Sequence, residues 1–207
     1  MTAARFVLHH HPQSRAQRIK WLLEETGAPY EIVLHDLEAG TQKRADFLRL
    51  NPDGKIPTLV DRGPDGTAEV PVTESAAILL HVADAVPDAR LAPAPGSTER
   101  GPYLTWIVYA AAVMEPALMD TVFPRVSPPP PVMQGWPPFD EALKRVENGL
   151  RPGPWLLGET FSAADVMVGS FLGWLSGWGK LPEPDRFADY LARIAERPAH
   201  RRAFGQD

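Results

Sequence analysis

The first 86 residues switch repeatedly between short apolar runs and segments with helical periodicity. Short runs rich in β-branched residues predict strands, and apolar residues three or four positions apart predict helices. The pattern predicts four strands, at residues 5–10, 30–35, 56–61 and 69–72. It predicts three helices, at residues 14–26, 45–50 and 74–86. The order β-α-β-α-β-β-α is typical of a mixed sheet with one antiparallel arm, and Pro71 favours an edge position for the fourth strand.

The pattern changes after residue 86. Residues 86–97, VPDARLAPAPGS, are rich in proline and alanine and predict a connection. Beyond it we expect only helices, at residues 99–123, 139–150, 162–177 and 184–196. A proline-rich loop at 124–138 has local polyproline character, and a rigid surface loop is favoured over a docking site for an SH3-like partner. We therefore predict an α/β domain over 1–86, a linker at 87–98 and an all-helical domain over 99–207.

Composition and charge narrow the class of protein. The chain is 44% hydrophobic and 23% charged with a net charge of −5, so it lacks the basic character of a nucleic-acid-binding domain. Its apolar runs are shorter than a membrane span, and the first ten residues lack the apolar core of a secretory signal, so we expect a cytoplasmic protein. The 207 residues contain no cysteine, which argues against disulfides, cysteine-bound zinc and a cysteine nucleophile.

The most specific local motif is NPDGKIPTLVD, residues 51–61. A proline just before a strand can follow a cis peptide bond, which is essentially a proline phenomenon. A cis bond at Pro57 would turn the backbone N–H and C=O of Ile56 outward, where they can pair with a bound peptide. An ordinary trans proline that opens a strand is the alternative.

A second motif, VTESAAILLHV at residues 72–82, opens a helix after the edge strand. The free N–H groups and positive dipole end of a first helical turn suit a carboxylate, and Ser75 adds a hydroxyl donor. Glu74 can accept from an ammonium group. A site that binds a carboxylate and an amine together recognises an α-amino-acid head, whereas simple capping by Thr73 is the alternative.

Taken together, these motifs resemble those of the cytosolic glutathione transferases of bacterial type. The resemblance covers nearly the whole chain and is carried by four segments in family order, SRAQRIKWLLEETGAPYE, NPDGKIPTLVD, TESAAILLH and FSAADVMVGSFL. It implies a thioredoxin-like domain followed by a helical bundle, glutathione as co-substrate, no metal, and a homodimer that binds neither nucleic acid nor membrane. The reaction it implies is attack of the glutathione thiolate on a hydrophobic electrophile, with reduction of organic peroxides as a variant. A non-catalytic binding or regulatory protein of the same fold is the alternative.

The resemblance also implies roles for individual residues. Ile56 would pair with the cysteinyl backbone of glutathione, with Pro57 in the cis form. Glu74 and Ser75 would hold the γ-glutamyl head. The glycine carboxylate would face Lys55 and either Lys43 or Arg44. Ser162 and Asp165 would form a structural cap at the start of a helix.

The stretch HHHPQSR, residues 9–15, lies where the thiol of such a ligand would be. The tyrosine that some relatives use falls on His9 or His10, and the serine of others falls on Gln13 or Ser14. We expect Ser14 to donate to the thiolate and Arg15 to supply a nearby cation, with His11 and Gln13 as neighbours. The alternatives are a plain helix cap for Ser14 and a solvated or ion-paired side chain for Arg15.

Two further groups of residues complete the expectations. Only His9 and His11 can share a strand face, and two ligands are too few for a firm zinc site. The long helix after the linker carries candidates for the electrophile pocket, for which ordinary helix core is the alternative; these are Tyr103, Trp106, Ala110, Met114 and Phe123.

Overall fold

The computed structural model describes residues 4–205, and contacts divide the chain into two compact units. Unit 1 comprises Met1–Leu91 together with Glu196–Asp207, and unit 2 comprises Ala92–Ala195. The division differs from the predicted domains in two ways. The first unit continues to Leu91 rather than ending at 86, and the last residues of the chain return to it.

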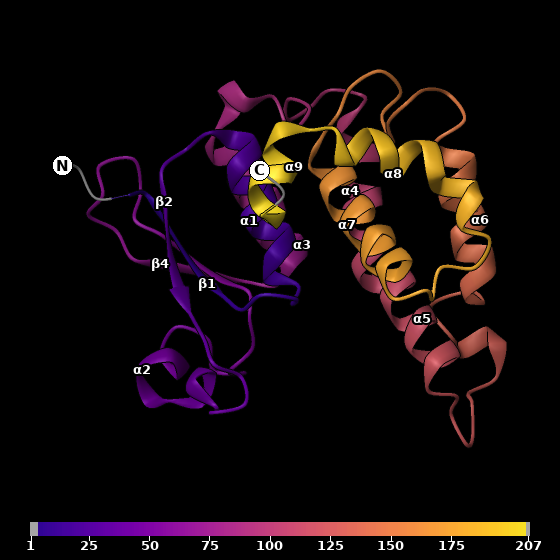
Figure 1. Ribbon diagram of the computed structural model, residues 1–207, viewed down its shortest axis with the longest axis horizontal. Helices are drawn as coiled ribbons and strands as arrows, with labels where there is room; N and C mark the ends of the chain where they lie inside the picture. Colours follow the sequence, from indigo (N-terminus) through magenta and orange to yellow (C-terminus); the bar gives the residue numbers. More distant parts are fainter. Residues whose placement is uncertain (1–3, 206–207) are drawn as a thin grey trace. The chain divides into compact units, whose positions relative to one another are not determined.

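Unit 1 is built on a four-stranded mixed sheet with the order β2-β1-β3-β4, and Figure 1 labels three of its strands. Its strands are β1 (Phe6–His10), β2 (Tyr30–Leu34), β3 (Thr58–Asp61) and β4 (Val70–Thr73). β1 runs parallel to β2 and antiparallel to β3, and β3 pairs antiparallel with β4. This is the predicted thioredoxin-like topology, with Pro71 in an edge strand. β3 begins two residues later than predicted, because Pro57 has no N–H to donate to a ladder.

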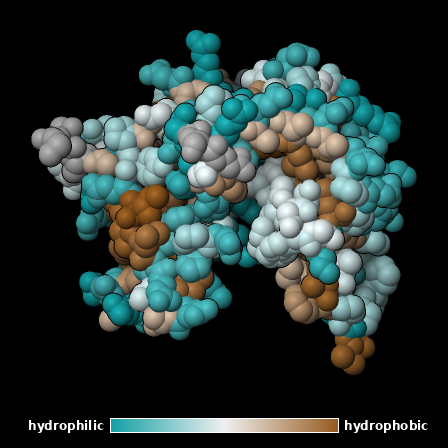
Figure 2. All heavy atoms as spheres, in the orientation of Figure 1, coloured by the Kyte–Doolittle hydropathy of each residue, from teal (hydrophilic) through white to brown (hydrophobic). Residues whose placement is uncertain are grey.

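Helices cover both faces of this sheet. They are α1 (Ala16–Thr26), α2 (Ala45–Leu48) and α3 (Ser75–Ala85), with the short turns η1 (Thr41–Lys43) and η2 (Pro87–Ala89). α1 contacts β1 and lies beside α3. The other face is covered by α2, whose Phe47 contacts the ring of His9 with centroids 5.0 Å apart. β2 is an edge strand, and Figure 2 shows an apolar patch over it, where Ile32, Val33 and Leu34 are exposed.

A last helix that the sequence pattern did not predict, α9 (Pro198–Phe204), packs along α1 (Figure 1). The Arg197 guanidinium donates to both carboxylate oxygens of Glu25, at 2.6 and 2.7 Å. The indole of Trp21 is fully buried, donates to Glu25 and meets the ring of His200 edge-on at 4.9 Å. This helix therefore completes the packing of α1 within unit 1.

Unit 2 is helical throughout. It contains α4 (Arg100–Tyr109), the π-helical turn η3 (Ala110–Met114), α5 (Glu115–Val122), η4 (Pro131–Met133), α6 (Phe139–Gly149), α7 (Ala163–Gly177), η5 (Pro184–Phe187) and α8 (Ala188–Ala195). The single helix predicted over 99–123 is thus present as one continuous helical run over 100–122 that contains a π turn. Pro116 lacks the N–H that a continuous α-helix would use there, and the π turn precedes it. No helix within residues 4–205 is long and apolar enough to cross a membrane.

The start of α7 carries the predicted cap. The Ser162 hydroxyl accepts from the Ala164 N–H at 3.2 Å, and Asp165 accepts from the Ser162 N–H at 3.0 Å. Asp165 also accepts from the hydroxyl of Tyr190 at 3.1 Å. Burial raises the pKa of Asp165 to about 6, against the opposing effect of these donors. Both residues are buried inside unit 2, as a structural role requires.

Candidate functional site

The strand register brings three chain segments together at one end of the unit 1 sheet, where two strands stop and a third begins. β1 and β3 pair His9 with Thr58, and β3 and β4 pair Thr58 with Thr73. β1 and β4 therefore end at the edge where β3 begins. At this end of the sheet His11 follows β1, Ile56 precedes β3 and Glu74 follows β4. The topology thus gathers the residues expected to bind the ligand.

The loop before β3 is held by the buried side chain of Asn51. Its amide donates to the Lys55 carbonyl at 2.8 Å and to the Thr58 hydroxyl at 3.0 Å, and it accepts from the Asp53 N–H at 3.1 Å. The Thr58 hydroxyl in turn donates to the Lys55 carbonyl at 3.1 Å. The Ile56–Pro57 bond is cis, as predicted. Asn51 therefore fixes the carbonyl that immediately precedes Ile56.

At the end of β4 the chain turns sharply into α3 through Glu74. This residue has φ +67° and ψ 125°, a region that residues other than glycine rarely adopt. Such strain persists where the surrounding structure imposes it, and it is common at binding sites. Glu74 is exposed while Ser75, at the first position of α3, is 8% exposed. The turn therefore holds a carboxylate beside the free N–H groups of a helix start.

The segment after β1 is held to β2 by two hydrogen bonds. The His35 N–H donates to the His10 carbonyl at 2.8 Å, and the Nδ1 of His11 lies 2.8 Å from the His35 carbonyl oxygen. The Ser14 hydroxyl donates to the His11 carbonyl at 2.7 Å and accepts from the Ala16 N–H at 3.2 Å. Ser14 thus holds the turn that precedes α1, and its hydroxyl must rotate before it can donate to a ligand.

Gln13 and Arg15 complete this turn. Gln13 is exposed and has φ +59°, in the left-handed region. Arg15 is exposed and precedes the first residue of α1. A guanidinium at this position adds positive charge to the start of the helix, where the dipole is also positive. The predicted donor and cation therefore lie at the predicted helix start.

Two buried histidines lie behind the site and form a directed chain of hydrogen bonds. The Thr41 hydroxyl donates to the Asp36 carbonyl at 3.1 Å, so it must accept from Nδ1 of His35, 3.2 Å away. Nε2 of His35 then accepts from Nδ1 of His9 at 2.9 Å. Both rings contact Phe47 on α2, with centroids 5.0 and 4.6 Å apart. Burial and the neighbouring His35 lower the pKa of His9 to about 4, and burial also lowers the pKa of His35.

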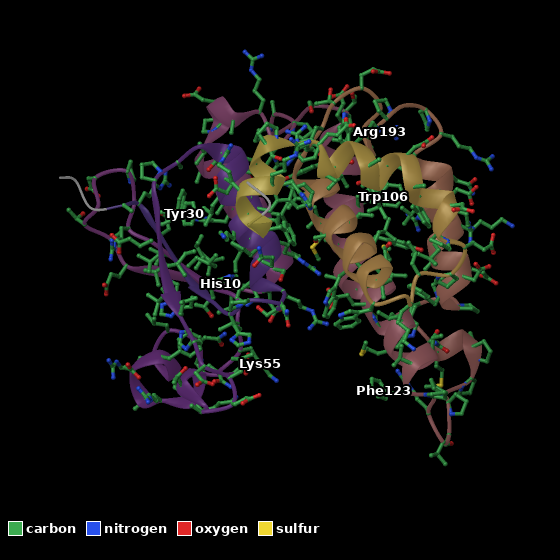
Figure 3. The ribbon with its side chains drawn as sticks, in the orientation of Figure 1. His10, Tyr30, Lys55, Trp106, Phe123 and Arg193 are labelled. Carbon is green, nitrogen blue, oxygen red and sulfur yellow. The ribbon has the colours of Figure 1, made fainter. Side chains whose placement is uncertain are left out.

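His10 faces the opposite side of the sheet. It is buried, with its Nδ1 unpaired, and Figure 3 shows it at the end of β1. Burial and the nearby Lys20 lower its pKa to about 4. His9 and His10 are therefore neutral at physiological pH. The three adjacent histidines occupy different environments, and within residues 4–205 no three His, Asp or Glu side chains gather as metal ligands.

Two predicted lysines lie around the loop before β3. The ammonium of Lys43 donates to the Asp53 carbonyl at 2.7 Å, and its side chain lies against Gly54. A Cβ at Gly54, which has φ +58°, would lie 2.7 Å from Cδ of Lys43. Lys55 is exposed, and its side chain extends outward from the loop (Figure 3). These contacts place Lys43 beside the loop, whereas Arg44 is exposed one residue further on.

The residues predicted to line an electrophile pocket are not brought to one open face. Tyr103, Ala110 and Met114 are fully buried in the core of unit 2, as the alternative interpretation held. Trp106 is half-buried and packs on α6, where a Cβ at Gly149 would lie 2.3 Å from its ring. Phe123 is 71% exposed at the end of α5 (Figure 3). The exposed apolar residues of α4 and α5 are others, namely Leu104, Val108, Met119 and Val122.

The proline-rich loop after α5 is anchored by one carboxylate. Asp120 accepts from the guanidinium of Arg125 at 2.7 Å, from the Gln134 amide at 3.2 Å and from the Trp136 indole at 2.9 Å. The Arg125 guanidinium also lies 5.3 Å from the Trp136 ring centroid. Asp120 therefore ties both ends of the loop together, as expected of a rigid surface loop.

Sequence reasoning did not identify Asn51 and His35. Asn51 is signalled only by its place in the NPDG segment, where it resembles an ordinary turn residue. His35 lies at the end of β2, 26 residues from its partner His9, and no spacing rule connects them. Asn51 donates to the Lys55 carbonyl and so holds the residue before Ile56. His35 contributes its own backbone carbonyl, which contacts the ring of His11.

Comparison with known proteins agrees with this geometry. Residues 5–84 match the glutathione S-transferase N-terminal domain, and residues 131–193 match the glutathione S-transferase C-terminal domain. The disulfide-bond oxidoreductase YfcG of Escherichia coli K12 is 30% identical over 201 residues, which cover 93% of this chain and 91% of the relative. Glutathione S-transferase GstA of Escherichia coli O157:H7 is 28% identical, with 85% of this chain and 86% of the relative covered.

Among solved structures, a sphingomonad glutathione S-transferase complexed with glutathione is 29% identical to this chain. The two structures align with a TM-score of 0.75, and the alignment covers 97% of this chain and 98% of the sphingomonad chain. The sequence matches span both units, and the strand order of unit 1 agrees with them. The chain therefore belongs to the glutathione S-transferase family.

Proposed function

We propose that this protein binds glutathione at the sheet edge of unit 1 and activates its thiol for attack on a hydrophobic electrophile. The observation that carries the proposal is the cis Ile56–Pro57 loop, held by Asn51 at the edge where β4 turns into α3. The outward backbone of Ile56 would pair with the cysteinyl residue. Glu74 would accept from the ammonium of the γ-glutamyl head, and Ser75 with the start of α3 would bind its carboxylate. Lys43 and Lys55 would face the glycine carboxylate.

The chemistry required at the sulfur is stabilisation of a thiolate. A free thiol has a pKa of about 8.5. Lowering that pKa by one requires interactions that stabilise the thiolate by about 1.4 kcal/mol relative to the thiol. Ionising most of the bound thiol at neutral pH therefore takes about 3 kcal/mol. The start of α1, the Arg15 guanidinium and a rotated Ser14 hydroxyl would supply it together. We expect Ser14→Ala to raise the pKa of the bound thiol, and an unchanged thiolate titration would remove Ser14 from this role.

The decisive experiment combines binding with turnover. Calorimetry with glutathione tests the site, and Glu74→Ala should weaken the affinity. Turnover is then measured with a nitro-activated aryl halide and with an organic hydroperoxide. Binding with turnover supports an enzyme, binding without turnover supports a binding or regulatory protein, and absence of binding refutes the proposed site. Enzymatic activity is expected in the cytoplasm, where glutathione is mainly reduced.

Disulfide reduction is a second candidate, favoured by the similarity to a protein named disulfide-bond oxidoreductase. Because this chain has no cysteine, the reaction would use two glutathione molecules, which become glutathione disulfide as the substrate disulfide becomes two thiols. Product analysis separates the candidates: conjugation consumes glutathione without forming its disulfide, whereas reduction forms one glutathione disulfide per bond reduced.

We also propose that the protein is a homodimer. The exposed apolar side chains Leu104, Val108, Met119 and Val122 lie along α4 and α5 and offer a surface that a second copy can bury. Sedimentation should give about twice the chain mass of 22.8 kDa at micromolar concentration. A sedimenting mass equal to that of one chain would contradict the proposal.

A further inference from the structure

His11 stands out at the sheet edge because one contact fixes the state of its ring. Its Nδ1 lies 2.8 Å from the carbonyl oxygen of His35, and a carbonyl oxygen can only accept. Nδ1 therefore carries the hydrogen. The other ring nitrogen, Nε2, is left with a lone pair and can take up a proton. The side chain is half-buried, so it remains accessible from the edge.

The strand register places His11 at the end of the sheet where the ligand backbone is proposed to bind. β1 and β3 are antiparallel, with Leu8 opposite Leu59 and His9 opposite Thr58. This pairing ends at His9 and Thr58; His11 follows it by two residues and Ile56 precedes it by two, at the same end of the two strands. The His35 N–H to His10 carbonyl bond keeps the chain on the track of β1 past the end of the strand. His11 and the residue that would pair with the cysteinyl backbone thus lie beyond the same end of the sheet.

The other groups at this edge are poor proton acceptors. The Ser14 hydroxyl is a hydrogen-bond donor, to the His11 carbonyl in this structure and to the thiolate in the proposed function, so it does not take up the thiol proton. His9 and His10 are buried and hold their neutral forms to low pH. Glu74 has a role in the proposed function as the partner of the ligand ammonium. A neutral thiol that binds here still has to lose its proton.

Resting on the proposed function, we propose that Nε2 of His11 accepts the thiol proton of bound glutathione. The S–H bond breaks as the N–H bond forms, and the imidazolium keeps its Nδ1–H bond to the His35 carbonyl. The sulfur retains the electron pair and attacks the electrophile. The imidazolium then returns its proton to the leaving group or to water. In this step His11 is a catalytic residue, and His35 is a positioning residue.

The test counts protons during binding. Calorimetry at pH 7.5 in two buffers of different ionisation enthalpy gives the number of protons released when glutathione binds, and absorbance at 240 nm reports the thiolate. The wild type should form the thiolate while releasing fewer than about 0.3 protons per site, because a free thiol at this pH is mostly protonated and the proton stays on the protein. S-methylglutathione, which has no thiol proton, corrects for protons exchanged by other groups.

His11→Asn is the matched variant, because an amide can still donate to the His35 carbonyl but offers no basic nitrogen. It should either lose the thiolate absorbance or release close to one proton per site when the thiolate forms. His81→Gln is the control, since His81 contacts Asp61 at the far end of β3 and should behave as the wild type. The amide of the introduced glutamine can still donate to Asp61.

The outcomes are separable. Wild-type protein that forms the thiolate and releases a full proton overturns the role of His11, and this result does not depend on whether the variant folds. An Asn variant that matches the wild type in both thiolate and proton count also overturns it. If neither glutathione nor S-methylglutathione binds the wild type, the proposed function itself fails.

Discussion

Replacement of Asn51 by alanine should loosen the loop that presents Ile56. The Asn51 side chain is 3% exposed and makes three hydrogen bonds, at 2.8, 3.0 and 3.1 Å, to Lys55, Thr58 and Asp53. A buried hydrogen bond contributes about 1 kcal/mol to stability. The Thr58 hydroxyl retains its own bond to the Lys55 carbonyl, which limits the loss. We therefore expect a decrease of about 2–3 kcal/mol in the free energy of unfolding.

Urea unfolding followed by circular dichroism measures this change, and calorimetry should show weaker glutathione binding at the same time. Asn148→Ala is the matched control, because Asn148 is exposed on α6 and its replacement should alter stability by less than about 0.5 kcal/mol. If Asn51→Ala were no more destabilising than Asn148→Ala, the network would not be holding the loop. Loss of stability with unaltered glutathione affinity would show that the loop is not part of the binding site.

The same structure supports three further predictions. Glu74→Gly should raise the free energy of unfolding by about 1 kcal/mol by relieving the positive φ, yet weaken glutathione binding; a variant that loses stability would contradict the strain. The pKa values of His9 and His10, about 4, lie below the ordinary 6.5, so the folded state binds fewer protons than the unfolded state between these pH values and stability should fall as pH drops from 6.5 towards 4. Imidazole NMR titrations check this, and midpoints above pH 6 would contradict it. Arg197→Ala should cost about 2 kcal/mol in urea unfolding because it leaves the carboxylate of Glu25 buried, and an unchanged midpoint would show that α9 does not stabilise α1.

The sequence was most informative where one residue type has one local consequence. Pro57 after Lys-Ile allowed a cis bond that the family resemblance then implied, and Pro71 predicted an edge strand. The alternation of strands and helices predicted the thioredoxin-like order, because side-chain periodicity directly reflects which face of an element is buried. The start of α7 was predicted from Ser162 and Asp165, because this pair of residues caps a helix through local hydrogen bonds.

What could not be predicted depends on contacts between distant residues. The spacing of Tyr103, Ala110 and Met114 marks one face of a helix, but periodicity does not tell whether that face meets protein or ligand. The direction of the Ser14 proton depends on the turn through Gln13, which spacing does not encode. No pattern predicted a helix after residue 196, whereas Pro198 occupies the first turn of α9, where proline is well tolerated.

The return of α9 to α1 means that unit 1 is discontinuous along the chain. Residues 197–204 are synthesised after the whole of unit 2, so Trp21 stays uncovered until all of unit 2 has been made. A recombinant fragment that stops at Leu91 would leave the same aromatic surface bare and should aggregate. Unit 2 is also joined to unit 1 at both of its ends, so a single protease cut at residues 92–98 would not release it.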